Sequence, residues 1–183
     1  GWLSDTIQAG PPSPRVLNLF GYTGVATLAC AAAGASVTHV DASKKAVAWA
    51  RENAALSGLA EKPVRWITED ARKYLQREVK RGSKYEGIIL DPPKYGRGPT
   101  GEVWRLFEDL GEVAGLCAEL LSENAQFLIL NGYAARISGA SLAGLLGQAL
   151  TGRGGRIDWG ELTLAEDEGP REIGLSFFAR WSG

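Results

Sequence analysis

The stretch Arg15-Val-Leu-Asn-Leu-Phe-Gly-Tyr-Thr-Gly24 decides the fold of this chain. Residues 16–20 form a mostly apolar run that predicts a buried strand, and Gly21 and Gly24 predict a tight turn into an alanine-rich helix over 26–33. A strand that breaks at a glycine turn into a helix is the arrangement by which a doubly wound sheet presents backbone groups to a nucleoside. The stretch therefore predicts a nucleoside site at the first turn of an α/β sheet.

The same alternation continues along the chain. Further apolar runs predict strands over 36–40, 64–67, 87–90 and 127–130. Helical patterns follow these strands, over 43–56 with Ser43 as N-cap, and over 71–80, 102–121 and 142–150. Residues 96–101 are predicted to be loop, and residues 157–164 and 173–181 to form a hairpin. The chain is therefore expected to be an α/β protein: a Rossmann-like, doubly wound, mostly parallel seven-stranded sheet with a C-terminal antiparallel hairpin and helices on both faces.

The composition of the chain limits the cellular compartments and the binding partners that can be expected. The formal net charge is −1, so no overall field draws the chain to nucleic acid or membrane, and any such partner must be bound locally. The two cysteines, Cys30 and Cys117, sit in helical stretches rather than in a metal-type pair, which predicts core packing, no metal and a reducing cytoplasm. No apolar run approaches the roughly 20 residues of a membrane span.

The amino-terminal segment is expected to lie outside the folded core. Methionine is absent even at position 1, which predicts that the chain is part of a longer protein. Residues 2–7 suggest a short amphipathic turn, and the prolines of 11–14 a stiff connector after which the globular core starts. We expect residues 1–14 to be a linker or the end of a missing N-terminal region, and residues 15–183 to be one domain.

The glycine turn is a weak signal when taken alone. Gly21 and Gly24 allow close backbone approach, and Thr23 is placed to cap the following helix, but such turns also occur without a ligand. The fingerprint of dinucleotide-binding proteins would need glycine where this chain has Leu19. A nicotinamide-dependent oxidoreductase is therefore disfavoured.

Two acids follow the second and third strands. Asp41 lies twenty residues after Gly21, the spacing of a carboxylate that binds ribose, although it could instead cap the helix that follows. Asp70 could accept a hydrogen bond from an adenine amino group while Ala71 offers backbone, or it could be only an N-cap. Both interpretations stay open for each acid.

Asp91-Pro-Pro-Lys-Tyr95 is the sharpest local signal. Pro92 keeps Asp91 extended, and successive prolines lack N–H groups, so the surrounding carbonyls are expected to project as a rigid shelf of acceptors. Asp91 and this shelf could receive N–H groups of an amide or nucleobase, Tyr95 could stack on a planar face, and Lys94 could meet a phosphate. A proline-stiffened turn with an exposed lysine is the alternative.

Taken together, these motifs resemble a known family. Its marks here are Leu17-Asn-Leu-Phe-Gly-Tyr-Thr-Gly24, Val40-Asp-Ala-Ser-Lys44, Ala50-Arg-Glu-Asn53 and Asp91-Pro-Pro-Lys-Tyr95. The chain resembles the class I S-adenosylmethionine-dependent methyltransferases, and more narrowly the bacterial branch that modifies bases of large-subunit ribosomal RNA. The resemblance runs from Arg15 to the terminal hairpin. It implies S-adenosylmethionine as cofactor, ribosomal RNA as substrate, and an additional region ahead of this domain.

The resemblance also implies residue roles. The cofactor would be bound by Asn18, Phe20, Gly21, Tyr22, Thr23 and Gly24 around its methionine part, by Asp41 with Ala42 and Ser43 at the ribose, and by Asp70 with Ala71 at the adenine. The target base would be oriented by the catalytic loop Asp91, Pro92, Pro93, Lys94 and Tyr95, with Tyr133 as a second candidate for stacking. No cysteine lies in the loops after the fourth and fifth strands, so cysteine-dependent carbon methylation is disfavoured.

The acceptor is therefore expected to be a nitrogen of an RNA base. Arg97 and Arg105 are candidates for phosphate contacts, whereas the basic cluster over 72–84 is more typical of a solvated helix face, and His39 of a packed or surface residue than of a general base. Methylation of a protein or small molecule, and a nucleoside- or RNA-binding module without catalysis, are the alternatives.

Overall fold

A computed structural model describes residues 1–133 and 137–183. Its main sheet has the strand order β3-β2-β1-β4-β7-β9-β8. The first five of these strands run parallel, and β9 pairs antiparallel with both β7 and β8. The predicted fold class is confirmed, including the C-terminal hairpin.

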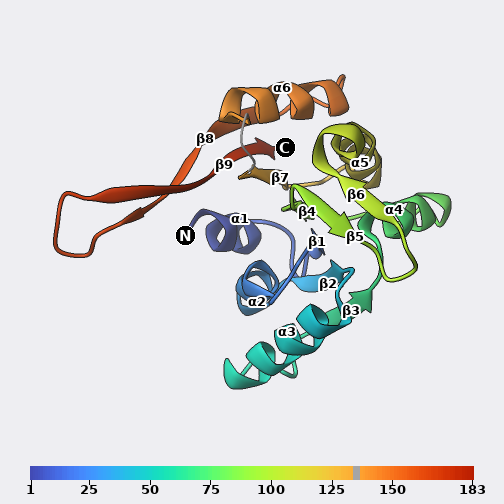
Figure 1. The fold of residues 1–183 in the computed structure, drawn as a ribbon, viewed down its shortest axis with the longest axis horizontal. Coiled ribbons are helices and arrows are strands. Elements are labelled where there is room, and N and C mark those ends of the chain that lie inside the picture. The colour runs from blue at the N-terminus through green and yellow to red at the C-terminus, as the bar shows by residue number, and fades with distance from the viewer. Residues whose placement is uncertain (134–136) are drawn as a thin grey trace.

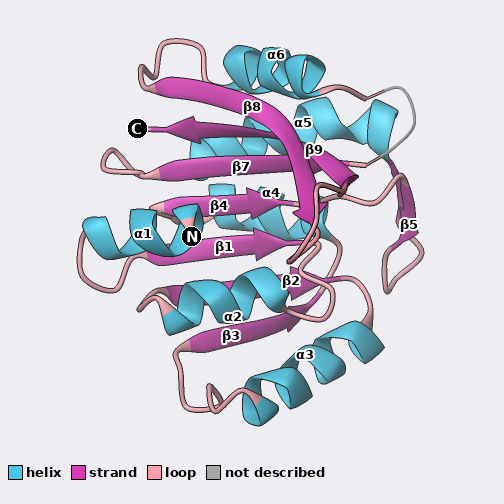
Figure 2. Cartoon of the chain, turned by 90° about the vertical axis from the view of Figure 1, so that its left-hand side faces the viewer, coloured by secondary structure: helices cyan, strands magenta, loops and turns pink. Residues whose placement is uncertain are grey.

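The sheet is built from strands followed by helices (Figures 1 and 2). The strands are β1 (Arg15–Leu19), β2 (Ser36–Asp41), β3 (Val64–Thr68), β4 (Gly87–Leu90), β7 (Phe127–Gly132), β8 (Arg156–Ala165) and β9 (Glu172–Ser182). The helices are α1 (Trp2–Ala9), α2 (Val25–Ala32), α3 (Lys44–Leu56), α4 (Ala71–Lys80), α5 (Leu106–Leu120) and α6 (Gly139–Ala149). Two short strands, β5 (Tyr95–Arg97) and β6 (Val103–Arg105), form a separate ribbon.

The helices cover both faces of the sheet, and each face has its own core. On one face, α4, α5 and α6 pack over a large cluster that includes Leu17, Leu19, Tyr74 and Leu128. On the other, α1 and α2 cover a smaller cluster, while α3 packs beside them on β2 and β3 (Figure 2). Continuous apolar strands such as 87–90 are buried on both sides, as expected for central parallel strands.

The structure confirms several local predictions. The Ser43 hydroxyl caps α3 by accepting the backbone N–H of Ala46 at 3.2 Å, and Gly34 lies after α2 with a φ of 104°. Cys30 and Cys117 are fully buried, and burial raises the pKa of the Cys30 thiol to about 12. Both cysteines are therefore packing residues with protonated thiols.

Other predictions are wrong. Residues 2–7 belong to a helix, α1, and Ile7 is 2% exposed within the smaller core, so the core begins before the proline connector. The N-cap of α2 is Gly24, which has no side chain, so Thr23 does not cap it. The region 96–101 is not all loop, because Gly96 and Arg97 belong to β5, and the helix expected over 102–121 begins only at Leu106 because 103–105 pairs with β5. Short strands with glycine and arginine carry no apolar alternation that would reveal them.

Candidate functional site

Two adjoining hollows open at the carboxyl ends of the parallel strands. They have volumes of about 430 and 460 Å³ and share Phe20, Tyr22 and Asp91 in their linings. They meet where β1 and β4 are neighbours but their following helices cover opposite faces, which is where doubly wound sheets bind ligands. All the predicted cofactor residues line one hollow or the other: Asp41, Ala42, Ser43, Asp70 and Ala71 the first, and Asn18, Gly21, Thr23 and Gly24 the second.

Only part of the predicted catalytic loop lines the hollows. Asp91 lines both hollows and Pro93 lines the first. Pro92 is buried, whereas Lys94 and Tyr95 are exposed and lie outside both linings. Asp91 and Pro93 are thus in position to touch a substrate in the hollow, and Lys94 and Tyr95 only a substrate that extends beyond it.

The turn after β1 is held in an unusual backbone conformation. Phe20 and Tyr22 have φ angles of 57° and 45°, in the left-handed region that residues with a Cβ seldom adopt. Such residues cost about 1–3 kcal/mol each and cluster at functional sites. Gly21 between them is needed for packing, because an added Cβ would lie 2.5 Å from the imidazole of His39. The strain therefore lies in the residues shared by the two hollows.

A buried polar chain supports the second hollow. The Asn18 amide donates to the Thr27 hydroxyl at 2.8 Å, and this hydroxyl lies 2.9 Å from Nδ1 of His39. His39 is fully buried, and burial lowers its pKa to about 4 despite the nearby charge of Asp41. The expectation that His39 is a packed residue is confirmed, and its effect on the site is indirect, through the orientation of Asn18.

Asp41 and Asp70 are both held by backbone N–H groups. Asp41 accepts from Tyr22 at 2.9 Å through Oδ2 and from Ser43 at 2.8 Å through Oδ1. Asp70 caps α4 by accepting from Lys73 at 3.0 Å through Oδ1, and it is 7% exposed. A carboxylate has about four acceptor positions, so these bonds leave room for donors of a ligand. Asp70 therefore both caps α4 and lines the first hollow, and the two roles are compatible.

The surroundings of Asp91 disfavour the charged form of its side chain. Burial raises the pKa of its carboxyl group, and a hydrogen bond with the Asn131 side chain partly opposes this effect. The pKa of Tyr133 is raised as well, first by burial and then by the negative charge of Asp91. Asn131 lines the second hollow and Tyr133 the first, so the ends of β4 and β7 together form the wall between them.

The shelf of free carbonyls predicted at the two prolines is only partly present. The Pro93 carbonyl accepts the indole N–H of Trp104 at 2.6 Å. Trp104 lies on β6, is 4% exposed, and packs its ring against Phe20 with 4.9 Å between the ring centroids. The ribbon β5–β6 therefore fastens the proline loop to the turn after β1, and the Pro93 carbonyl is already used within the protein.

The basic cluster on α4 also differs from its expected role. Arg72 pairs with Asp109 at 2.8 Å, Lys73 pairs with Glu102, and Arg77 makes bonds of 2.6 and 2.7 Å with Glu69. The bond from Lys73 is the main reason why the pKa of Glu102 falls to about 2.

These acids lie on or beside the elements that border the site. Glu69 lines the first hollow, Glu102 lies in the connection between β5 and β6, and Asp109 accepts the backbone N–H of Arg105 at 2.6 Å. The basic row of α4 therefore joins the helix to the ribbon and to the end of β3, rather than remaining a freely solvated face.

Sequence reasoning missed several lining residues. They include Leu3, Glu69, Gly96, Gly98, Trp104 and Asn131. Trp104 and Gly96 come from the unexpected ribbon, and Leu3 from a segment expected to lie outside the core. Asn131 and Glu69 had a local signal, since a polar residue near the end of a strand is what also drew attention to Asp41 and Asp91.

Within the described part of the chain, no three or more candidate metal-ligating side chains form a cluster. None of the helices in this part has both the length and the apolar character needed to cross a membrane.

Comparisons with known proteins show the family of the chain. The family model described as Conserved hypothetical protein 95 matches residues 2–129. A protein named ribosomal RNA large subunit methyltransferase K/L from Shewanella frigidimarina is 37% identical over 119 residues, which are 64% of this chain and 16% of the relative. The chain thus spans only a small part of this curated relative.

Solved structures are similar over almost the full chain. The S-adenosylmethionine-dependent methyltransferase from Agrobacterium tumefaciens has a TM-score of 0.95 and 48% identity, covering 99% of this chain and 60% of that protein. A magnesium protoporphyrin IX methyltransferase from Synechocystis, solved with bound S-adenosylmethionine, has a TM-score of 0.63 and 21% identity, covering 99% of this chain and 74% of that protein. The second similarity concerns the fold alone.

Proposed function

The chain belongs to the Conserved hypothetical protein 95 family, and we propose that it is an S-adenosylmethionine-dependent methyltransferase acting on a ring or exocyclic nitrogen of a ribosomal RNA base. The observation that carries this proposal is the position of Asp91, which lines both hollows at the junction of β1 and β4. A methyl donor that spans both hollows would carry its methyl group to their junction, where an acceptor base would meet it beside this carboxylate. The name of the Shewanella relative supports RNA as the acceptor.

The residues present fit the proposed cofactor. Asp41 is fixed by two backbone N–H groups and retains acceptor positions for ribose hydroxyls. Asp70 and Ala71 edge the first hollow where an adenine could lie, and the side chain of Asn18 is oriented by Thr27 at the second. When bound, this cofactor supplies a methyl group that is already activated by a positively charged sulfur.

The protein's own task is then to position the acceptor and exclude water. By accepting an N–H of the acceptor, Asp91 holds the nitrogen in place beside the donor, and the proton that this nitrogen loses on methylation passes to the carboxylate or to water. Burial of Asp91 strengthens this hydrogen bond, because the local dielectric is lower than that of water. Trp104 holds the Pro93 carbonyl and so fixes the loop that follows Asp91. Since half-exposed Tyr133 lines the first hollow, its ring can stack on the base.

A base in structured RNA would have to leave its stack to reach Asp91. A ribosomal substrate also supports the cytoplasmic location that the cysteine content predicts.

Two measurements test the proposal. Titration calorimetry with S-adenosylhomocysteine should give heat of binding, and labelled methyl transfer from S-adenosylmethionine should appear in ribosomal RNA from a strain that lacks the gene. The absence of binding heat for the folded protein would contradict the cofactor, and label found only in protein or in small molecules would contradict the RNA acceptor. Binding without turnover on any acceptor would favour a module without catalysis.

Asp91→Asn tests the role of the carboxylate. This change keeps the size of the side chain but removes its charge, so we expect methyl transfer to fall by about a hundredfold, with S-adenosylhomocysteine affinity changed little. Asp158→Asn, on β8 and away from both linings, is the matched control and should leave both quantities unchanged. Equal loss of cofactor binding and turnover in Asp91→Asn would show that Asp91 acts on the cofactor rather than on the acceptor.

A further inference from the structure

The β5–β6 ribbon has two different faces. Gly96 and Trp104 are paired and face inward, since a Cβ added to Gly96 would lie 3.7 Å from both Pro93 and Trp104. Side chains alternate along a strand, so Tyr95, Arg97 and Arg105 share the opposite face. Tyr95 lies directly across from Arg105, and Arg97 lies two residues farther along the same strand.

This outer face is exposed and continuous with the site. Tyr95 is 53% exposed, the Arg105 side chain is 58% exposed, and Arg97 is exposed as well. Arg97 also lines the first hollow, so the outer face begins at the mouth of that hollow. The ribbon is tied down by the Trp104 bond to Pro93 and by the ion pair between Lys73 and Glu102. It therefore presents its outer face on a fixed support.

The positive charge of this face is available to a partner. Arg97 makes no ion pair with the described residues, and Arg105 pairs only with Glu108, at 3.1 Å on the surface. Exposed ion pairs of this kind contribute little to stability, so a phosphate can replace Glu108 as the partner of Arg105 with only a small loss of free energy. The arginines of α4 differ, because Arg72 and Arg77 are held by acids at 2.8 and 2.6 Å.

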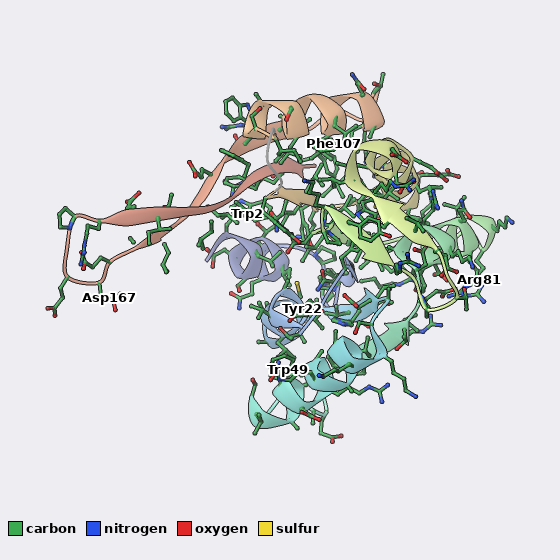
Figure 3. All side chains as sticks on the ribbon, in the orientation of Figure 1. Trp2, Tyr22, Trp49, Arg81, Phe107 and Asp167 are labelled. Atoms are coloured by element: carbon green, nitrogen blue, oxygen red, sulfur yellow. The ribbon has the colours of Figure 1, made fainter. Side chains whose placement is uncertain are left out.

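A second prominent surface has the opposite charge. The arm formed by β8 and β9 projects from the body of the molecule with Asp167 at its tip (Figures 1 and 3). Glu166 and Glu168 flank Asp167 in the sequence. An acidic tip repels a polyanion, so the arm is not suited to contact RNA.

We propose that the outer face of the β5–β6 ribbon, formed by Tyr95, Arg97 and Arg105, binds the single-stranded RNA segment that flanks the target base. This inference rests on the proposed function and specifies where its substrate runs. The two guanidinium groups bind phosphates, and the Tyr95 ring stacks on a neighbouring base, the combination that single-strand-binding surfaces use. The strand then enters the first hollow past Arg97, with the target base beside Asp91.

Binding of a short fluorescent single-stranded RNA to the full chain tests this surface. The association constant, measured by anisotropy over a range of salt concentrations, should fall with added salt by about 0.7 logarithmic units per phosphate contact and per tenfold in salt. Arg97→Ala and Arg105→Ala should each reduce this salt dependence by about 0.7. Tyr95→Ala should weaken binding at least about fivefold at one salt concentration, whereas Tyr95→Phe should retain most of the affinity.

Arg156→Ala is the matched control. Arg156 is an exposed arginine paired with a nearby acid, Asp158 at 2.7 Å, as Arg105 is, but it lies where β8 begins, at the opposite edge of the sheet. The proposal is overturned if Arg156→Ala reduces the salt dependence as much as Arg97→Ala does, or if none of the three ribbon variants changes RNA binding.

S-adenosylhomocysteine calorimetry on the same proteins separates this inference from the proposed function. Normal cofactor binding and methyl transfer with unaltered RNA affinity in the ribbon variants would refute the RNA surface alone. Salt-dependent RNA binding through the ribbon without cofactor binding would refute the methyltransferase and leave the surface supported.

Discussion

Replacing Trp104 by phenylalanine isolates one contact that positions the proline loop. The indole N–H donates to the Pro93 carbonyl at 2.6 Å from a side chain that is only 4% exposed. Phenylalanine keeps an aromatic ring against Phe20 but leaves this carbonyl without its donor, at a cost of about 1–3 kcal/mol. The smaller ring adds about 1 kcal/mol through lost packing. We expect the lower part of this range, because the Pro93 carbonyl borders a hollow that water can enter.

The decisive comparison is with Trp181→Phe. Trp181 is 3% exposed and its indole N–H donates to the Gly154 carbonyl at 2.7 Å, so the two tryptophans make the same kind of bond at the same depth. Trp181 pairs with Leu128 near the beginning of β7, at the edge of the sheet opposite the site. Urea denaturation should give similar losses of unfolding free energy for both variants.

Methyl-transfer kinetics should separate the two tryptophans. We expect Trp104→Phe to lower kcat/KM for the RNA by about tenfold to a hundredfold through misplacement of the loop, and Trp181→Phe to leave it unchanged. Equal kinetic effects of the two changes would refute the reasoning, because Trp104 would then act only on stability.

Three further outcomes concern residues that line or support the site. Gly21→Ala places a Cβ 2.5 Å from the His39 ring and should lower the unfolding free energy by about 1–3 kcal/mol, whereas Gly111→Ala, which meets open space on a helix, should not destabilise the protein in the same urea titrations. The pKa of His39 is about 4 in the folded protein and ordinarily 6.5, so the unfolded chain takes up the proton first as the pH falls. The free energy of unfolding therefore keeps its full value above pH 6.5 and falls by about 3 kcal/mol as the pH is lowered toward 4. His39→Leu should flatten this part of the stability profile, and an unchanged slope would contradict the assignment. Asn131→Ala removes the hydrogen bond that lowers the pKa of Asp91, so the acid limb of the pH profile of kcat/KM should move to higher pH. A move to lower pH would contradict the assumption that Asp91 acts in its ionised form.

The order of the main elements was predictable because each strand and helix carries its own signal. Continuous apolar runs such as 87–90 identify buried parallel strands, and caps such as Ser43 identify where helices begin. The acids Asp41, Asp70 and Asp91 could be placed together before the structure, since the carboxyl ends of parallel strands share one edge of the sheet. This is why all the predicted cofactor residues line the two hollows.

The contacts between elements distant in the sequence were not predictable in the same way. Trp104 occupies the Pro93 carbonyl from a three-residue strand that has no periodic pattern of its own. Arg72, Lys73 and Arg77 are indistinguishable in sequence from a solvated face, because their acidic partners lie on other elements. The roles assigned to the individual residues of the site stay predictions.

The position of α1 has a practical consequence for anyone trimming this protein. The prolines at 11–14 invite a cut just before Arg15, yet Leu3 borders the second hollow, Ile7 is 2% exposed, and the ring of Trp2 lies edge-on to Phe127 with 6.0 Å between centroids. A protein that starts at Arg15 would expose the apolar core residues that α1 covers. It would also lose Leu3 from the lining of the second hollow. Poor solubility and weak ligand retention would then arise together, and neither should be mistaken for a defect in the chemistry.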